Sequence, residues 1–160
     1  MSKPANARDG QQFIVKNRRA NFDYAIEEHF EAGMVLSGSE VKSMRAGKVD
    51  VVDSYVQVDR GEAWLKQLYV APFEQASAFP HETRRNRKLL LHAKEIDMIE
   101  QALSRGGYTV VPMSLYFKEG RVKVDLGLGK GKKHYDKRAD IAKKDAERET
   151  RVAVREGMRR

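Results

Sequence analysis

Strict alternation of apolar and polar residues is clearest over residues 121–128. The apolar positions are Val122, Val124, Leu126 and Leu128. This period of two predicts a half-buried strand. Residues 108–117 supply its hairpin partner across a turn at Glu119-Gly120, and Pro112 predicts a bulge or an edge position within that partner.

Shorter stretches with the composition of strands precede this hairpin, at residues 13–16, 23–31, 52–58 and 63–70. Glu28 breaks the alternation of residues 23–31, so we expect a bulge or bend there. Gly33 then permits a turn, after which residues 34–36 are predicted to start another strand. Residues 52–58 and 63–70 are predicted to pair as a hairpin around a turn at Arg60-Gly61.

Two segments have the signals of helices. Ser39 is a suitable N-cap for a helix over residues 40–45, with Gly47 as its stop. Apolar residues three and four apart predict a longer helix that starts at residue 93 and ends at Gly106-Gly107. Residues 72–88 have no apolar period, contain two prolines and end in a basic cluster, so we expect a loop there.

Short strands with one principal helix before the last hairpin indicate a mainly β protein. We predict an antiparallel β-barrel that is closed or nearly closed, resembles an oligonucleotide-binding (OB) fold, and carries flanking α-helices. A flat α+β sandwich is the alternative.

Charge divides the chain into a body and a tail. The 160 residues contain 31 Lys and Arg against 23 Asp and Glu, a net charge of +8. Residues 129–160 hold twelve of the basic residues against six acids and few large apolar residues, so this basic tail cannot form its own core. We therefore predict a flexible arm over residues 1–12, a barrel over 13–128, and a tail that is disordered when free and becomes helical on a partner.

Composition also limits the chemistry. The chain has no cysteine, and its four histidines lie on different predicted elements without the spacing of a metal pair. The glycine–lysine run at 127–133 lacks the Gly and Ser or Thr that a phosphate loop requires. We therefore expect that the protein is not an enzyme and has no metal site and no cofactor. Without a long apolar run or a signal-like N-terminus, we expect a cytoplasmic protein with no membrane contact, and its basic charge favours a polyanionic partner.

Ordered motifs along the body and the start of the tail resemble the SmpB family, which binds SsrA RNA (transfer-messenger RNA, tmRNA). The matching stretches are residues 17–20, 23–28, 30–33, 38–47, 53–56, 87–91, 111–118, 120–124 and 130–138. The most specific are GSEVKSMRAG at 38–47 and KGKKHYDKR at 130–138.

The resemblance implies an OB barrel that is not catalytic. Family members bind the tRNA-like domain of tmRNA and deliver it, with elongation factor Tu and GTP bound through tmRNA, to stalled ribosomes. There trans-translation tags the nascent peptide and rescues the ribosome. The family's basic tail is thought to form a helix in the empty mRNA channel near the decoding centre, against ribosomal RNA.

Carried over by position, the resemblance implies an RNA-contact surface at Asn17, Glu31 and Leu90. The basic neighbours expected to join it are Arg18, Arg19, Lys42, Arg45, Arg87 and Lys88. The implied ribosome-binding tail residues are Lys130, Lys132, Lys133, Tyr135, Asp136, Lys137 and Arg138. Glu31 fits such a surface as an acceptor for base or sugar donors or as an orienter of nearby arginines.

Structural roles remain open for two of these residues, namely a strand-end salt bridge for Glu31 and a core position for Leu90. Two other functions also remain open. A basic barrel alone is compatible with a generic single-strand RNA chaperone, and a small basic body with a cationic extension is compatible with a structural ribosomal protein.

Overall fold

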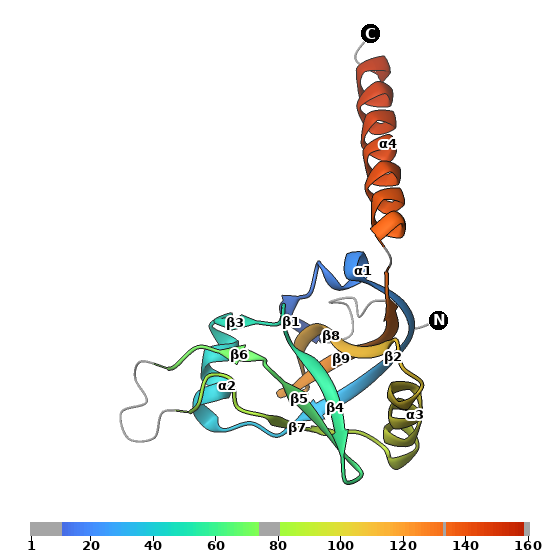
Figure 1. The fold of residues 1–160 in the computed structure, drawn as a ribbon. Helices are drawn as coiled ribbons and strands as arrows, with labels where there is room; N and C mark the ends of the chain where they lie inside the picture. Colours follow the sequence, from blue (N-terminus) through green and yellow to red (C-terminus); the bar gives the residue numbers. More distant parts are fainter. Residues whose placement is uncertain (1–10, 74–80, 133, 159–160) are drawn as a thin grey trace.

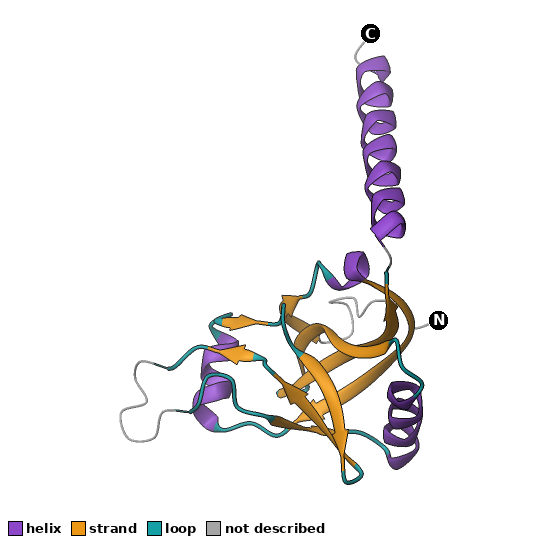
Figure 2. Ribbon diagram, in the orientation of Figure 1, coloured by secondary structure: helices purple, strands orange, loops and turns teal. Residues whose placement is uncertain are grey.

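A seven-stranded antiparallel sheet forms the centre of the molecule (Figures 1 and 2). The computed structural model describes residues 11–73, 81–132 and 134–158. In spatial order the strands are β1 (Gln11–Lys16), β8 (Tyr108–Lys118), β9 (Arg121–Gly131), β2 (Tyr24–Met34), β7 (Arg87–Leu90), β5 (Glu62–Lys66) and β4 (Tyr55–Asp59). A small second sheet pairs β3 (Val49–Asp50) with β6 (Tyr69–Val70).

The described residues also form four helices: α1 (Ala20–Asp23), α2 (Gly38–Arg45), α3 (Ala93–Ser104) and α4 (His134–Met158). Figure 1 shows α1, α2 and α3 at three separate places around the curled sheet, while α4 projects away from it. The predicted mainly β fold with flanking helices is therefore confirmed.

The curled sheet remains open. Among the described strands, no ladder joins the two edge strands β1 and β4, although β4 also packs against β8. The core lies inside the curl, because the alternating apolar residues of β8 and β9 that were identified in the sequence point inward. Leu115, Val124 and Leu126 are each fully buried there.

Both predicted irregularities in the long strands are present. The pairing of β2 with β9 shifts between Ile26 and Glu28, and the pairing of β8 with β9 shifts between Pro112 and Ser114. Because β8 lies between β1 and β9, Pro112 occupies a bulge of an interior strand and not an edge.

Several local predictions were wrong, among them the strand expected to start at residues 34–36, since β2 ends at Met34. Gly33 is not a turn: β2 continues through it to Met34, because both neighbouring strands pair with this segment. Ser37, not Ser39, caps α2, and its side chain forms a reciprocal capping box with Glu40. Residues 63–70 do not form one strand, because the left-handed backbone of Gln67 (φ 63°) turns the chain from β5 into β6 and the second sheet.

The predicted boundary after residue 128 falls inside β9, which continues to Gly131. Gly129 allows this, since a Cβ there would lie 2.3 Å from the backbone oxygen of Ala25. The tail beyond is one helix, α4, which starts three residues after β9 ends. Its disorder in the free protein remains a prediction. The predicted arm over residues 1–12 is too long, because Gln11 and Gln12 start β1 and pair with β8. Residues 1–10 of that arm lie outside the described part of the chain.

Candidate nucleic-acid interface

Leu90 lies in an open groove on the outer face of the sheet. Pairing places Leu90 of β7 opposite Gly33 of β2, and Gly33 opposite Lys123 of β9. The side chain of Leu90 is 55% exposed, so the core position that was left open for it is wrong. The groove has a volume of about 580 Å³, and Glu31, Lys88 and Lys123 are among its lining residues.

Gly33 leaves room for the side chain of Leu90 at this edge of the groove. A Cβ at position 33 would come within 3.3 Å of the Cβ and 3.4 Å of the Cδ1 of Leu90. A larger residue would therefore push the leucine away from β2. The groove combines one exposed apolar side chain with lysines, which suits an unstacked base next to a phosphate.

Glu31 is held in place by two donors from β8. The Tyr116 hydroxyl donates a 2.6 Å hydrogen bond to Oε2, and Lys118 Nζ lies 3.3 Å from Oε1. Burial acts to raise the pKa of Glu31, but the hydrogen bonds from Tyr116 and Lys118 outweigh it, so the pKa is lowered overall. Glu31 is thus an anion at neutral pH that is held by the neutral Tyr116 hydroxyl and the cationic Lys118.

Tyr116 is almost fully buried on this outer face. The ring of Phe13 covers it edge to face, with 6.1 Å between the ring centroids. Burial and the hydrogen bond to Glu31 both raise the pKa of Tyr116, so its hydroxyl stays protonated and remains a donor. The orientation of the Glu31 carboxylate therefore depends on a rigid aromatic pair behind it.

A second polar pair continues this face along β2 and β9. His29 Nδ1 lies 3.2 Å from both carboxylate oxygens of Asp125. Burial raises the pKa of Asp125, and the contact with His29 partly opposes that rise.

Sequence reasoning missed part of the basic lining of this face. Lys118, Arg121 and Lys123 surround Glu31 in an adjoining hollow, together with Glu119. A signal was available, because Lys123 and Asp125 are the polar members of the alternation in β9 and must face outward when its apolar members face the core. Tyr116 had no comparable signal, since its partner Glu31 is 85 residues away in the sequence.

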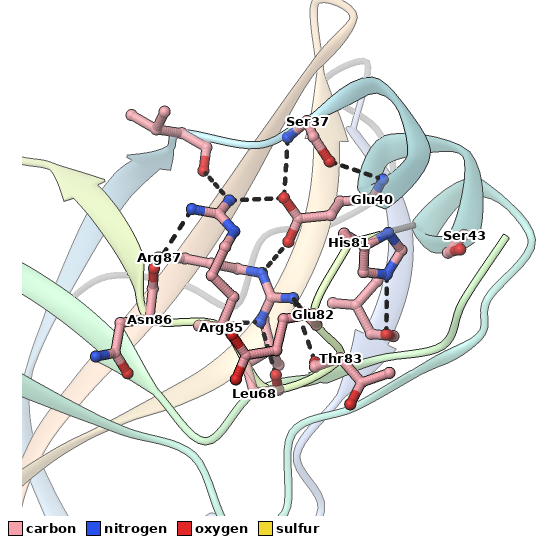
Figure 3. Close-up of polar contacts among 12 residues, drawn as sticks. Ser37, Glu40, Ser43, Leu68, His81, Glu82, Thr83, Arg85, Asn86 and Arg87 are labelled. Atoms are coloured by element: carbon pink, nitrogen blue, oxygen red, sulfur yellow. Dashed lines mark hydrogen bonds and ion pairs between the residues drawn. The ribbon is translucent and has the colours of Figure 1, made fainter. Parts of the chain in front are cut away.

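Arg87 does not reach the surface. It is fully buried, and its guanidinium pairs with the buried carboxylate of Glu40 and donates to Leu68 O at 2.7 Å (Figure 3). Arg85 completes the cluster with a 2.6 Å bond to the other oxygen of Glu40. Arg87 is therefore not available for the direct RNA contact that was predicted. It has a structural role instead and joins β7 to α2.

Lys88, the neighbour of Arg87, points outward into the groove. Its Nζ lies 3.2 Å from Glu62 Oε1, and both side chains remain partly exposed. This exposed pair can exchange its carboxylate for an RNA phosphate at little cost.

Asn17 is also mostly buried. Its side-chain amide donates to Pro112 O at 3.0 Å, and its backbone N–H donates to Met113 O at 2.8 Å. Both bonds are made at the bulge of β8 and fix the chain just before α1. The exposed residues there are Arg18 and Arg19, and neither is among the residues that line the groove that holds Leu90.

Lys42 and Arg45 lie on the exposed side of α2. Lys42 Nζ is 5.4 Å from the ring centroid of Phe73, and Arg45 Cζ is 5.5 Å from that of Phe117. Both residues remain exposed. They form a separate basic surface, so the structure does not bring all the predicted RNA-contact residues into one site.

The tail begins next to α1, where the chain leaves the body. Lys130 is exposed at the end of β9, with its Nζ 4.8 Å above the ring of Tyr108. Lys132 pairs with Asp140, and Lys137 Nζ lies 3.3 Å from Asp23 Oδ1. Arg138 is exposed. Tyr135 and Asp136 belong to the first turn of α4, and Lys133 lies outside the described residues.

The described residues contain no cluster of three or more His, Asp or Glu side chains that could hold a metal ion. None of the described helices is long and apolar enough to cross a membrane. Fold and surface together define a small basic β-sheet protein with an exposed groove and a projecting helix that is exposed along almost its whole described length.

Comparison with known proteins agrees with this class. The family model described as SmpB protein matches residues 14–156. A relative from Lysinibacillus sphaericus named SsrA-binding protein is 50% identical over 143 residues, which cover 89% of this chain and 92% of the relative. The SsrA-binding protein of Bacillus subtilis is 49% identical over 146 residues, with 91% and 94% covered.

A solved structure is similar as well. It is described as "tmRNA-SmpB: a journey to the center of the bacterial ribosome", and the matched chain has a TM-score of 0.64 and 48% identity, covering 75% of this chain and 85% of that one. The chain belongs to the SmpB family, as its motifs suggested.

Proposed function

We propose that this protein is a non-catalytic RNA-binding protein that binds the tRNA-like domain of tmRNA and delivers it to stalled ribosomes for trans-translation. The observation that carries this proposal is the extent of the family match, which includes the groove at Leu90 and almost all of α4. The relatives are named for binding SsrA RNA, and the solved structure is described by tmRNA and the ribosome together.

The groove of the body is our candidate for the tmRNA contact. Leu90 offers an apolar surface to a base that has left its stack, and Lys88 and Lys123 offer charge to the adjacent phosphates. Glu31 accepts hydrogen bonds from base or sugar donors. Its two donors from β8 leave its carboxylate in one orientation, which favours a ligand of defined shape over an arbitrary single strand.

The tail is our candidate for the ribosome contact. Residues 130–138 supply its cations, and α4 would lie in the mRNA channel near the decoding centre, against ribosomal RNA. The described side chains of α4 beyond its first turn are almost all exposed, so the body leaves them available. Elongation factor Tu with GTP would join through tmRNA, and the process takes place in the cytoplasm. We also propose that the curled sheet is an OB-type barrel, which the packing of β4 against β8 supports.

A competition experiment tests this function against a generic RNA chaperone. The full-length protein is bound to labelled tRNA-like RNA, and either the unlabelled RNA or a random single-stranded oligomer of equal length is added. We expect the tRNA-like RNA to compete at least tenfold better. Equal competition by both RNAs would support the chaperone and contradict the proposal.

A further inference from the structure

The outer face of β7, β5 and β4 carries the only tryptophan of the chain, Trp64. These three strands lie side by side, in this order, at one edge of the sheet (Figure 1). Ala63 and Leu65 of β5 are fully buried in the core, so Trp64 between them points to the outer face. Trp64 is only half-buried there.

Strand pairing places flat or apolar side chains and lysines next to one another across this face. Trp64 is opposite Lys88 of β7, and Lys66 of β5 is opposite Tyr55 of β4. Leu90 lies two residues beyond Lys88 on the same side of β7. Trp64 is therefore a diagonal neighbour of both Leu90 and Tyr55, at a spacing of roughly 7 to 8 Å. We call these five residues the diagonal track.

The acidic side chains of this face lie near the turn between β4 and β5. Pairing places Asp59 opposite Glu62 beside that turn. The carboxylate of Glu62 is already paired with Lys88, with 3.2 Å between Oε1 and Nζ. The diagonal track leads from Leu90 away from the turn towards Tyr55, so a polyanion that follows it moves away from the acids.

A hollow beside Trp64 adjoins the groove that holds Leu90. It has a volume of about 340 Å³ and is lined by Asp59, Arg60, Glu62, Trp64, Lys66 and Asn86. Glu62 also lines the groove. The groove and the hollow therefore meet at the ion pair of Glu62 with Lys88, and a strand that occupies the groove can continue to Trp64.

The rings of Trp64 and Tyr55 differ from other rings of the protein in having no stacked partner. A Lys nitrogen or an Arg Cζ lies no more than 5.6 Å from the ring centroid in each of Phe13, Phe22, Tyr69, Phe73, Tyr108 and Phe117. Within the described part of the chain, no cation and no second ring is stacked in this way on Trp64 or Tyr55. Tyr55 is also 39% exposed, so both rings are accessible to a ligand.

We propose that the diagonal track binds an unpaired stretch of RNA that continues from the nucleotide at Leu90. Two further bases stack on the rings of Trp64 and Tyr55, since every base has a flat face that an aromatic ring can cover. Lys88 and Lys66 contact the phosphates that join these nucleotides. The inference rests on the proposed function, because the stretch belongs to the RNA that the groove holds.

The fluorescence of Trp64 tests the stack directly, because no other tryptophan contributes to the signal. The full-length protein is titrated with a uridine hexanucleotide or with an abasic ribose-phosphate chain of equal length and charge. We expect the hexanucleotide to quench the emission with saturation and the abasic chain to leave it nearly unchanged, because only the hexanucleotide has bases to stack. Equal quenching by both ligands, or quenching by neither, would overturn the proposal.

Substitutions that remove or keep the ring test the contribution to affinity. Trp64→Leu keeps an apolar side chain without a flat ring, and Trp64→Phe is its matched control. We expect Trp64→Leu to weaken the affinity for tRNA-like RNA at least about fivefold, the lower limit for one stacked base, and Trp64→Phe to stay within about threefold of the parent. Tyr55→Leu and Tyr55→Phe should show the same contrast. Fluorescence anisotropy with labelled RNA measures these affinities.

Equal affinities of the Leu and Phe variants at one position would remove that residue from the track, and equality at both positions would overturn the proposal. Circular dichroism checks the fold. Tyr55→Leu changes an exposed side chain, so it keeps the test decisive if Trp64→Leu does not fold. The proposed function fails separately: if a random oligomer competes as well as the tRNA-like RNA while the Leu and Phe variants still differ, only that function is wrong.

Discussion

The Tyr116 hydroxyl donates a 2.6 Å hydrogen bond to the carboxylate of Glu31, and this bond links the aromatic pair of Phe13 in β1 and the buried Tyr116 in β8 to the exposed groove. An exposed carboxylate would ordinarily sample several orientations. Here it has one buried donor and one lysine donor, so the acceptor that it offers to a ligand is fixed in space.

Tyr116→Phe removes this bond while keeping the ring. The pKa of Glu31 should rise, because one of the bonds that lower it is lost. We expect the affinity for tRNA-like RNA to fall about threefold to tenfold, since a hydrogen bond to a charged group contributes roughly 1 kcal/mol or more. NMR titration of the Glu31 carboxyl and fluorescence anisotropy with RNA measure the two effects.

Tyr108→Phe is the matched control for that variant. Tyr108 also donates to a glutamate, with 3.2 Å between its hydroxyl and Glu27 Oε2, but outside the groove. It should leave the RNA affinity within about twofold of the parent value. An equal loss in both variants would contradict a specific role for the Tyr116–Glu31 pair.

Leu90→Ala should weaken RNA binding without unfolding the protein. The side chain is 55% exposed, so its truncation creates little cavity and should change the free energy of unfolding by less than about 1 kcal/mol. Loss of its contact with a base should reduce affinity about fivefold to tenfold. Val52→Ala, at a residue that is 51% exposed and outside the groove, should bind RNA normally.

The buried Glu40 links stability to pH. Burial opposes its ionisation, but hydrogen bonds from Ser37, Arg85 and Arg87 lower its pKa to about 2. Because this pKa lies below the ordinary value of 4.5, the stabilisation is complete above pH 4.5 and is lost as the pH falls from 4.5 towards 2. The contribution is on the order of 3 kcal/mol.

Denaturant unfolding of the parent protein and of Glu40→Gln at several pH values measures this effect. The difference in their free energies of unfolding should shrink steadily between pH 4.5 and pH 2. Glu62→Gln is the control, because Glu62 and its partner Lys88 are partly exposed, and its difference should stay within about 0.5 kcal/mol. A constant difference for Glu40→Gln would show that Glu40 is not the titrating group.

Arg87→Ala should reduce stability and leave RNA recognition intact. The substitution removes the buried ion-pair partner of the Glu40 carboxylate, which typically costs about 3 to 5 kcal/mol of unfolding free energy. Fluorescence anisotropy on the fraction that remains folded should give the parent affinity for RNA. A specific loss of affinity in a fully folded variant would contradict this and would support a direct contact between Arg87 and RNA.

Charge reversal in the tail separates the two binding surfaces. Lys132→Glu together with Lys133→Glu should weaken ribosome binding strongly, with a reduced salt dependence, since each lost phosphate contact changes the log–log slope by roughly 0.7 to 0.9. Affinity for the tRNA-like RNA should stay within about threefold. Filter binding to ribosomes and anisotropy with RNA give the two values.

Lys94→Glu with Arg105→Glu changes the net charge by the same amount at the exposed side and end of α3, away from the tail. This control should retain ribosome binding. Parallel losses of RNA and ribosome binding in the tail variant would contradict the division between body and tail.

The sequence predicted those parts of the fold that depend on short-range pattern. The hairpin of β8 and β9, its turn at Glu119-Gly120, and the end of α3 follow from alternation, helical spacing and glycine positions. Glu119 and Gly120 have φ values of 53° and 77°, as a tight turn between these strands requires.

Contacts between residues far apart in the sequence determine the parts of the fold and of the site that the short-range pattern did not predict. The conformational freedom of Gly33 suggested a turn, but pairing with β7 and β9 keeps it in a continuous strand. Arg87 was interpreted as a surface cation because its partner Glu40 lies 47 residues away and no local pattern links them. Leucine usually prefers the core, so its residue type favoured a buried Leu90. Its exposure follows from the pairing of β7 with β2, which places it opposite Gly33 on the outer face.

Recovery of this protein from cells, followed by sequencing of the RNA bound to it, tests most directly whether it binds one tRNA-like RNA. The account predicts that tmRNA dominates the recovered RNA after ribosomes are removed, and that Leu90→Ala loses this enrichment while Val52→Ala keeps it. A broad mixture of messenger and ribosomal RNA fragments, unchanged by Leu90→Ala, would contradict it.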